Sequence, residues 1–251
     1  MTHKDIYTKF MIEYDKANVT SSYPSLTEYE VATVLDKAYN ALIAQKVSGN
    51  NVRRTGFESD LKSISDLQPL IMEETISTSH NTEVKNMKYF DIPEQFLYFV
   101  DCNIKYTLTK SLDGIPMDEA ENTVSADRIL PVKLVTHQMA EGFFESAYNM
   151  PWVKQPVCFI ENNKLNVVYD SIKTPIFEVR LGFIKKPNTF VKDLTRFPAE
   201  STFFDGAGGR VTFECNPTMA EELISLAVAF ALENVESQRL NAKLNMRGLE
   251  A

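Results

Sequence analysis

The stretch "VKNMKYFDIPEQFLYFVDCNIKYTLTK" (Val84–Lys110) decides the fold class of this 251-residue chain. It is rich in aromatic and β-branched residues, which favour strands, and Pro93 interrupts it, so the sequence predicts strands broken near that proline. On both sides of this region, apolar residues recur at helical spacing. The sequence therefore predicts an α+β fold, with N- and C-terminal helices packed together around a mostly antiparallel β middle.

Three helices are predicted before the strands, each from apolar residues at helical spacing. The first covers Lys4–Asp15. The second begins at the capping-box pair Thr27 and Glu30 and ends at Gly49, which suits the left-handed conformation of a helix stop. The third ends at Pro69, because proline breaks a helix interior. The predicted apolar face of this third helix consists of Phe57, Leu61, Ile64 and Leu67.

The second half of the chain alternates strand and helix signals. The run "RILPVKLV" (128–135) reads as a strand, and Thr136 is placed to cap a short helix over 137–148. Asn162–Asn163 suits a tight hairpin turn between two β-rich runs, and another strand follows over 175–184. The last helix begins at Pro217, and we expect it to pack against the helix that starts after Thr27, since both have strong apolar faces.

We expect a single structural domain over residues 1–251, helical over 1–75 and 216–245 and β-rich over 84–186. Two segments are expected to project from it. The segment 111–127 is too polar to build a core of its own and lies between two strands expected to pair. Its acidic residues are candidates for lining a channel or for making contacts between rings. They are Asp113, Asp118, Glu119, Glu121 and Asp127.

The second projecting segment is the arm, defined here as residues 187–209. Its phenylalanines have no fixed period, which suits a segment that takes its shape from a partner surface. The alternative is a loop folded back on its own domain. Trp152, the only tryptophan, is a further candidate for a subunit contact. The predicted anchors of the arm are Phe190, Phe197, Phe203 and Phe204.

Charge and cysteine content exclude several classes of protein. The net charge of −8, with a pI near 5.1, argues against binding nucleic acid through a broad basic surface. No apolar run reaches the roughly 18 residues that a membrane-spanning helix needs, and the N-terminus lacks the apolar region of a secretory signal. The three cysteines are far apart in sequence and without a CxxC pair, so we expect reduced, mostly buried thiols.

No residue pattern indicates catalysis, a metal or a cofactor. His137 and Glu141 stand four apart on a predicted helix, but no second pair of ligands is near in sequence. His3 and His80 lie in polar surroundings and are expected to be solvated. The adjacent acids Glu73–Glu74 and Glu221–Glu222 are expected to serve solubility or the helix dipole, because neighbouring helical residues point about 100° apart. The glycines of "DGAGG" (205–209) lack the ending of a phosphate loop.

The order of several motifs along the chain carries a resemblance. In sequence they are "SLTEYEVATVLDKAYNALIAQKVSG" (25–49), "YFDIPEQFLYFVDCNIKY" (89–106), "LVTHQMAEGFFESAYNMP" (134–151), "IENNKLNVVYD" (160–170), "VRLGFIKKP" (179–187) and "CNPTMAEELISLAVAFALE" (215–233). This series resembles the head–tail ring proteins of crAss-like bacteriophages and, more distantly, is similar to the tubular tail adaptor proteins of short-tailed phages. The arm is longer than the link expected in that family.

The resemblance implies a non-enzymatic virion protein in the head-to-tail connector, assembled in the bacterial cytoplasm. It implies a ring of copies of this chain, with twelve-fold symmetry, that contacts the portal and other tail ring proteins. DNA would pass through the ring without being specifically bound, and an acidic channel wall would repel it. Two other classes stay open from the residues alone: a small hydrolase-like enzyme whose site is assembled from distant segments, and a monomeric binding module.

Overall fold

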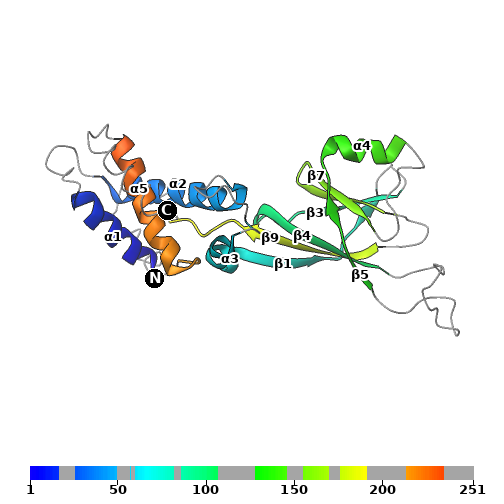
Figure 1. The fold of residues 1–251 in the computed structure, drawn as a ribbon, viewed down its shortest axis with the longest axis horizontal. Helices are drawn as coiled ribbons and strands as arrows, with labels where there is room; N and C mark the ends of the chain where they lie inside the picture. The colour runs from blue at the N-terminus through cyan, green and yellow to red at the C-terminus, as the bar shows by residue number, and fades with distance from the viewer. Residues whose placement is uncertain are drawn as a thin grey trace. The chain divides into compact units, whose positions relative to one another are not determined.

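The computed structural model describes residues 1–16, 26–49, 57, 60–81, 86–106, 128–145, 155–169, 176–190 and 213–234. The chain divides into two compact units, and this differs from the single domain expected from the sequence. The helical unit consists of Met1–Leu70 together with Pro187–Ala251, and the β unit is the insertion Ile71–Lys186. Figure 1 shows the elements of each unit, and the class is α+β as predicted.

The helical unit is built on three long helices. These are α1 (His3–Lys16), α2 (Glu28–Ser48) and α5 (Pro217–Asn234). Helix α5 packs against both α1 and α2, so the predicted pairing of helices from the two ends of the chain is confirmed (Figure 1). The reason is that each helix has an apolar face, which packing against another helix removes from water.

The ends of α2 follow the predicted chemistry. The Oγ1 atom of Thr27 accepts a hydrogen bond from the Glu30 amide at 3.3 Å, and the Glu30 carboxylate accepts one from the Thr27 amide at 2.8 Å. This capping box satisfies two backbone donors that the first helical turn leaves unpaired. At the other end Gly49 has φ 70°, a left-handed conformation that costs glycine no steric strain.

Helix α5 starts as the sequence predicts. Pro217 is its first residue, and the Asn216 side chain accepts a hydrogen bond from the Thr218 amide at 3.2 Å. Its middle is buried on nearly every side, which fits a helix packed between two others.

The third predicted helix differs from expectation. Helix α3 spans only Leu61–Leu67, and Pro69 lies in a 3-10 turn over Gln68–Leu70. Leu61 is 84% exposed, so the predicted apolar face is wrong at that position. The residues that α3 buries are Ser63, Asp66 and Leu67. Asp66 can be buried because its carboxylate is paired with Lys46 inside the unit. The expected helical region to residue 75 is also wrong, since strand β1 begins at Ile71.

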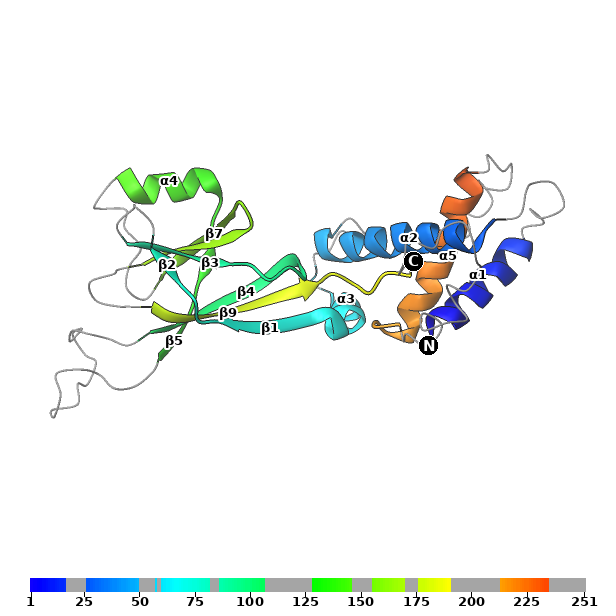
Figure 2. The ribbon, with the colours of Figure 1, turned by 180° about the vertical axis from the view of Figure 1, so that it is seen from behind.

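Two sheets form the β unit (Figure 2). The first has the order β1-β9-β4-β5, with β1 (Ile71–Ile76), β9 (Ile176–Lys185), β4 (Phe96–Tyr106) and β5 (Arg128–Pro131). The second has the order β2-β3-β8-β7-β6, with β2 (His80–Asn81), β3 (Met87–Asp91), β8 (Lys164–Val168), β7 (Val157–Glu161) and β6 (Lys133–Leu134). Among the strand pairs of the described residues, β6 with β7 is parallel and the others are antiparallel.

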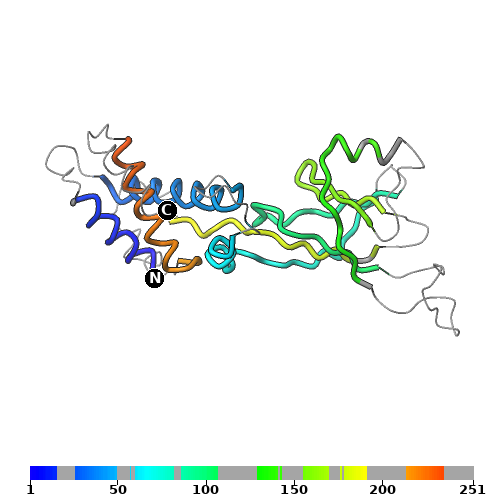
Figure 3. The backbone as a smooth tube through the Cα atoms, in the orientation of Figure 1, coloured from blue at the N-terminus to red at the C-terminus, as the bar shows by residue number. Residues whose placement is uncertain are grey.

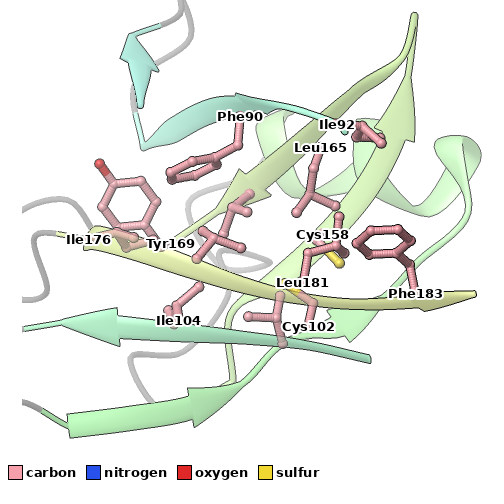
Figure 4. Packing of buried hydrophobic residues seen from close by; sticks show 13 residues of the cluster. Phe90, Ile92, Cys102, Ile104, Cys158, Leu165, Tyr169, Ile176, Leu181 and Phe183 are labelled. Atoms are coloured by element: carbon pink, nitrogen blue, oxygen red, sulfur yellow. The ribbon is translucent and has the colours of Figure 1, made fainter. Parts of the chain in front are cut away.

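A shared core holds the two sheets together. Figure 4 shows its buried side chains, which come from strands of both sheets. Cys102 and Ile104 of β4 and Leu181 of β9 belong to the first sheet, and Cys158 of β7 and Leu165 of β8 to the second. The alternation along β4 (Cys102, Ile104 and Tyr106 are buried) is the period-2 pattern of a strand with one face in a core.

Two local predictions in this unit are confirmed. Asn162 and Asn163 have φ 50° and 60°, and they join β7 to β8 as the left-handed pair of a tight hairpin turn. Helix α4 (His137–Glu145) begins after Thr136, whose hydroxyl accepts a hydrogen bond from the Met139 amide at 3.4 Å. Helix α4 packs on β7, as Figure 2 also shows.

Candidate functional site

The base of the arm is an aromatic cluster in the helical unit, which we define as His3, Tyr39, Phe190 and Phe213. The Tyr39 ring of α2 lies 6.3 Å from the Phe190 ring and 5.1 Å from the Phe213 ring, centroid to centroid. The His3 ring of α1 stacks on Phe190 at 4.1 Å. Phe190 and Phe213 are the residues that border the segment 191–212, so both ends of this segment are packed on one tyrosine ring.

Backbone hydrogen bonds fix the same two ends. The Phe190 amide donates to the Asp36 carboxylate of α2 at 2.7 Å, and the Asn188 amide donates to the Glu214 carboxylate at 2.9 Å. The Phe213 amide donates to the Met1 carbonyl at 2.8 Å. Figure 3 shows the chain beyond β9 running beside α2. The described residues on either side of the segment 191–212 therefore lie at neighbouring places on α1 and α2.

The Tyr39 side chain is also held in position at its hydroxyl group. Its hydroxyl lies 3.1 Å from the Cys215 sulfur, and both groups are buried. Burial raises the pKa of the Tyr39 hydroxyl above its ordinary value, and the neighbouring Cys215 raises it further. Burial also raises the pKa of the Cys215 thiol to about 11, although the hydrogen bond with Tyr39 lowers it. Both groups are therefore neutral at physiological pH, and they act as packing rather than as reactive groups.

This geometry corrects one expectation about the arm. Phe190 is 2% exposed within its own chain, so its ring is not available as an anchor on another subunit. The first residues of the arm, from Pro187 to Phe190, pack on the helical unit because Asp36 and Tyr39 supply a hydrogen-bond acceptor and an aromatic surface there. The remaining predicted anchors, Phe197, Phe203 and Phe204, lie outside the described residues.

The acidic segment has a comparable base in the β unit. Strands β4 and β5 pair antiparallel, with Tyr106 directly opposite Arg128. The chain between these two residues therefore starts and ends at adjacent positions of one sheet, as the expected pairing of its flanking strands requires. Outside the described residues lie the five acids of this segment, Asp113, Asp118, Glu119, Glu121 and Asp127, and also Trp152.

An ionic cluster joins three helices of the helical unit. We define it as Lys46 of α2, Lys62 and Asp66 of α3 and Glu222 of α5. The Lys46 ammonium lies 2.7 Å from the Asp66 carboxylate and 3.0 Å from the Glu222 carboxylate. Lys62 reaches the other oxygen of Glu222 at 2.7 Å. The Lys46 and Asp66 side chains are only 9% and 2% exposed, so they are satisfied by each other rather than by water.

The pKa values of this ionic cluster follow from its pairing. Burial opposes the charge on Lys46, but hydrogen bonds to Asp66 and Glu222 outweigh burial, so the Lys46 pKa lies above its ordinary value. For Glu222, burial raises the pKa, and the hydrogen bonds from Lys62 and Lys46 lower it by more. The charged forms are therefore the stable ones, which is the behaviour of a structural cross-link between helices.

Sequence reasoning missed the ionic cluster, although one signal was present. Lys46 follows Tyr39, Leu42 and Ile43 on the same apolar face of α2, and a lysine there needs a buried partner. The sequence predicts a solubility or helix-dipole role for Glu222, whereas the structure places it in ion pairs with Lys46 and Lys62. Glu73 and Glu74 lie on strand β1 rather than on a helix, and Glu73 is 4.0 Å from Arg180 of β9.

The histidines are placed by packing. His3 is 2% exposed, so the expectation of a solvated side chain is wrong, because Phe190 covers its ring. His80 is partly exposed, stacks on Tyr89 at 4.8 Å and lies 3.3 Å from the Asp91 carboxylate. His137 contacts the Phe159 ring edge-on at 5.6 Å. Among the residues that the structure describes, no three histidine, cysteine or acidic side chains gather as a metal site would require.

The cysteines are reduced and buried, as the sequence predicts. Cys102, Cys158 and Cys215 are free thiols and all are buried, as predicted. Within the described ranges, none of the helices combines the length and the apolar character needed to cross a bilayer. Comparison of the chain with protein-family models and with curated proteins finds no match.

Proposed function

We propose that this chain is a structural protein of a bacteriophage virion and that copies of it form a ring in the head-to-tail connector, through which the genome passes. Its partners are further copies of itself, the portal and other tail ring proteins. Virions carry it after assembly in the bacterial cytoplasm, and it has no enzymatic activity. The ordered motifs between residues 25 and 233, which resemble head–tail ring proteins of crAss-like phages, are the source of this proposal.

The observation that supports it best is the position of the residues that flank two long segments of the chain. The residues that flank the segments 107–127 and 191–212 are neighbours: Tyr106 pairs with Arg128, and Phe190 and Phe213 both pack on Tyr39. A ring closes when one surface of a subunit meets a different surface of the next, and a segment that starts and ends at neighbouring residues supplies such a surface without disturbing the core.

The net charge of −8 fits this role as well. An acidic wall repels the DNA phosphates, so the genome passes a ring of such subunits without adhering to it. The ionic cluster and the aromatic cluster hold the helices and the base of the arm in a fixed arrangement, which suits a protein that bears load rather than one that opens around a ligand.

The proposal is tested by assembly. The purified chain is examined by size exclusion with light scattering over a concentration series, followed by negative-stain imaging. We expect closed rings, or a mass that rises with concentration toward one limiting oligomer. A chain that stays monomeric throughout the series contradicts the self-assembling ring.

Two deletion variants identify which segment makes the contact. Replacing 107–127 with Asn-Gly leaves Tyr106 and Arg128 joined by a two-residue hairpin turn, which their direct pairing permits. Replacing 191–212 with a flexible linker of about six Gly and Ser residues rejoins two ends that already pack on Tyr39. Both variants should keep the circular dichroism and the melting temperature of the parent, and the 191–212 variant should lose the ring.

A further inference from the structure

The fold brings together two cysteines that are 56 positions apart in sequence, Cys102 of β4 and Cys158 of β7. They belong to different sheets and to the same buried core, in which Cys102 is 2% exposed and Cys158 0%. Figure 4 shows both cysteines in this core with Leu181 beside them. Nothing in the spacing of the three cysteines along the sequence predicts that two of them meet.

The backbone explains why they meet at this point. The short stretch from Val132 to Val135 passes from one sheet to the other. The Val132 amide donates to the Cys102 carbonyl at 2.8 Å, and the Val135 amide donates to the Cys158 carbonyl at 2.9 Å. Three extended residues span about 10 Å at most, so this stretch ties the two cysteine backbones together where the sheets converge. Both side chains lie in the single buried cluster that the two sheets share.

We propose that Cys102 and Cys158 are a site of intramolecular oxidation, at which a small-molecule disulfide converts the two thiols into a disulfide bond between the sheets. Cys102 or Cys158 first exchanges with the small disulfide R–S–S–R and releases one R–SH. The other cysteine then attacks the mixed disulfide, forms the Sγ–Sγ bond and releases the second R–SH. The protein loses two electrons and two protons, and the small disulfide gains them.

Burial of the two thiols sets the rate of this oxidation. The hydrogen bond with Cys158, together with burial, raises the pKa of the Cys102 thiol, so the thiolate that attacks a disulfide is scarce in the folded state. Oxidation is therefore slow in the intact protein and faster when the sheets open transiently. Once formed, the bond ties β4 to β7 and restricts the unfolded chain, which raises the melting temperature of the β unit.

Cys215 provides an internal control. It is buried in the helical unit, and its sulfur pairs with the Tyr39 hydroxyl rather than with another thiol. The Cys215→Ser variant retains the proposed site as the only two thiols of the chain. The variants Cys102→Ser and Cys158→Ser each remove one half of the site.

The experiment approaches equilibrium from two directions. Folded, reduced protein and protein unfolded in urea under reducing conditions are each brought into the same series of oxidised and reduced glutathione buffers. After equilibration the thiols are trapped with an alkylating reagent, and the digest is analysed by mass spectrometry. We expect both directions to converge on one linked peptide pair, Cys102 with Cys158, with Cys215 alkylated and with a rise in melting temperature on the order of 5–10 °C.

The Cys215→Ser variant should behave as the parent, and the two other serine variants should give no intramolecular disulfide. Recovery of Cys102 and Cys158 as alkylated thiols, or as separate glutathione adducts, from both directions and in every buffer would overturn the proposal. A link that involves Cys215 in preference to this pair would overturn it equally.

Discussion

Lys46 and Asp66 form an ion pair of 2.7 Å between helices α2 and α3, and the two side chains are 9% and 2% exposed. For a pair so deeply buried, the stability gained by forming it is much smaller than the stability lost by removing one partner. Forming it adds little net stability, because both charges lose their hydration, whereas removing one partner leaves a charge without compensation. Glu222 of α5 contacts the same ammonium, so the pair joins all three helices at one point.

Replacing Lys46 with methionine should therefore destabilise the helical unit by about 3–5 kcal/mol, because Asp66 would stay buried without its cation. The matched control is Lys62→Met. Lys62 also contacts Glu222, but its side chain is 51% exposed, and such pairs contribute at most about 1 kcal/mol. Urea denaturation followed by circular dichroism at 222 nm compares the two variants. Equal losses would mean that burial of Lys46 does not set its contribution.

The ionic cluster also predicts how stability depends on pH. The pKa of Glu222 is lowered from 4.5 in the folded protein, so its contribution is complete above pH 4.5 and is lost as the pH falls through the folded value. The difference in unfolding free energy between the parent and Glu222→Gln should be constant near neutral pH and shrink at acid pH. Lys46 behaves in the opposite direction. Because its pKa is raised from 10.5 in the folded protein, its contribution to stability is complete below pH 10.5 and is lost as the pH rises through the folded value.

Denaturation curves collected from pH 7 to pH 3 check this dependence. The control is Glu221→Gln, which removes an ion pair with Lys9 in which both side chains are about half exposed. The difference in unfolding free energy between the parent and Glu221→Gln should stay below about 1 kcal/mol across this pH range. A Glu222→Gln difference that grows as the pH falls would contradict the assigned direction of the pKa shift.

Phe190→Ala should destabilise the isolated subunit by about 3–5 kcal/mol, because it removes a ring that packs on both His3 and Tyr39 and leaves a cavity. Ile12→Ala in the same unit is the comparison, since Ile12 is 49% exposed and its loss should change stability much less. Thermal and chemical denaturation of the monomer measure both. If Phe190→Ala weakened assembly and left the stability of the monomer unchanged, the ring would be an anchor between subunits after all.

Gly182, on β9 of the four-stranded sheet, lies directly against the Asp101 side chain of the neighbouring strand. A Cβ atom there would stand 1.7 Å from the Oδ1 atom of Asp101 on β4, so Gly182→Ala should cost about 1–3 kcal/mol. The cost should fall in an Asp101→Ala background, and a double-mutant cycle measures that coupling. Gly142→Ala is the control on α4, where nothing lies within 4 Å, and the better helix propensity of alanine should stabilise it by about 0.5–1 kcal/mol. Coupling near zero would show that Asp101 moves aside without cost.

Sequence by itself determined the elements whose signals are local. The capping box of Thr27 and Glu30, the start of α5 at Pro217 and the Asn162–Asn163 turn follow from backbone chemistry within a few residues, and all are found where the sequence predicts them. The α+β class follows from the alternation of helical and strand patterns along the chain. The pairing of α2 with α5 follows because each has a strongly apolar face that needs a partner, and each covers the other.

Only the tertiary structure decided which distant side chains meet. The base of the arm on Tyr39, the pairing of Lys46 with Asp66 and the meeting of Cys102 with Cys158 each join residues with no fixed spacing in the sequence. Strand β1 was missed because the acidic run after Met72 lacks an alternating apolar pattern, and its pairing along β9 supplies the order that local propensity does not. Burial explains these differences: a polar group is placed by the partner that satisfies it, and the fold chooses that partner.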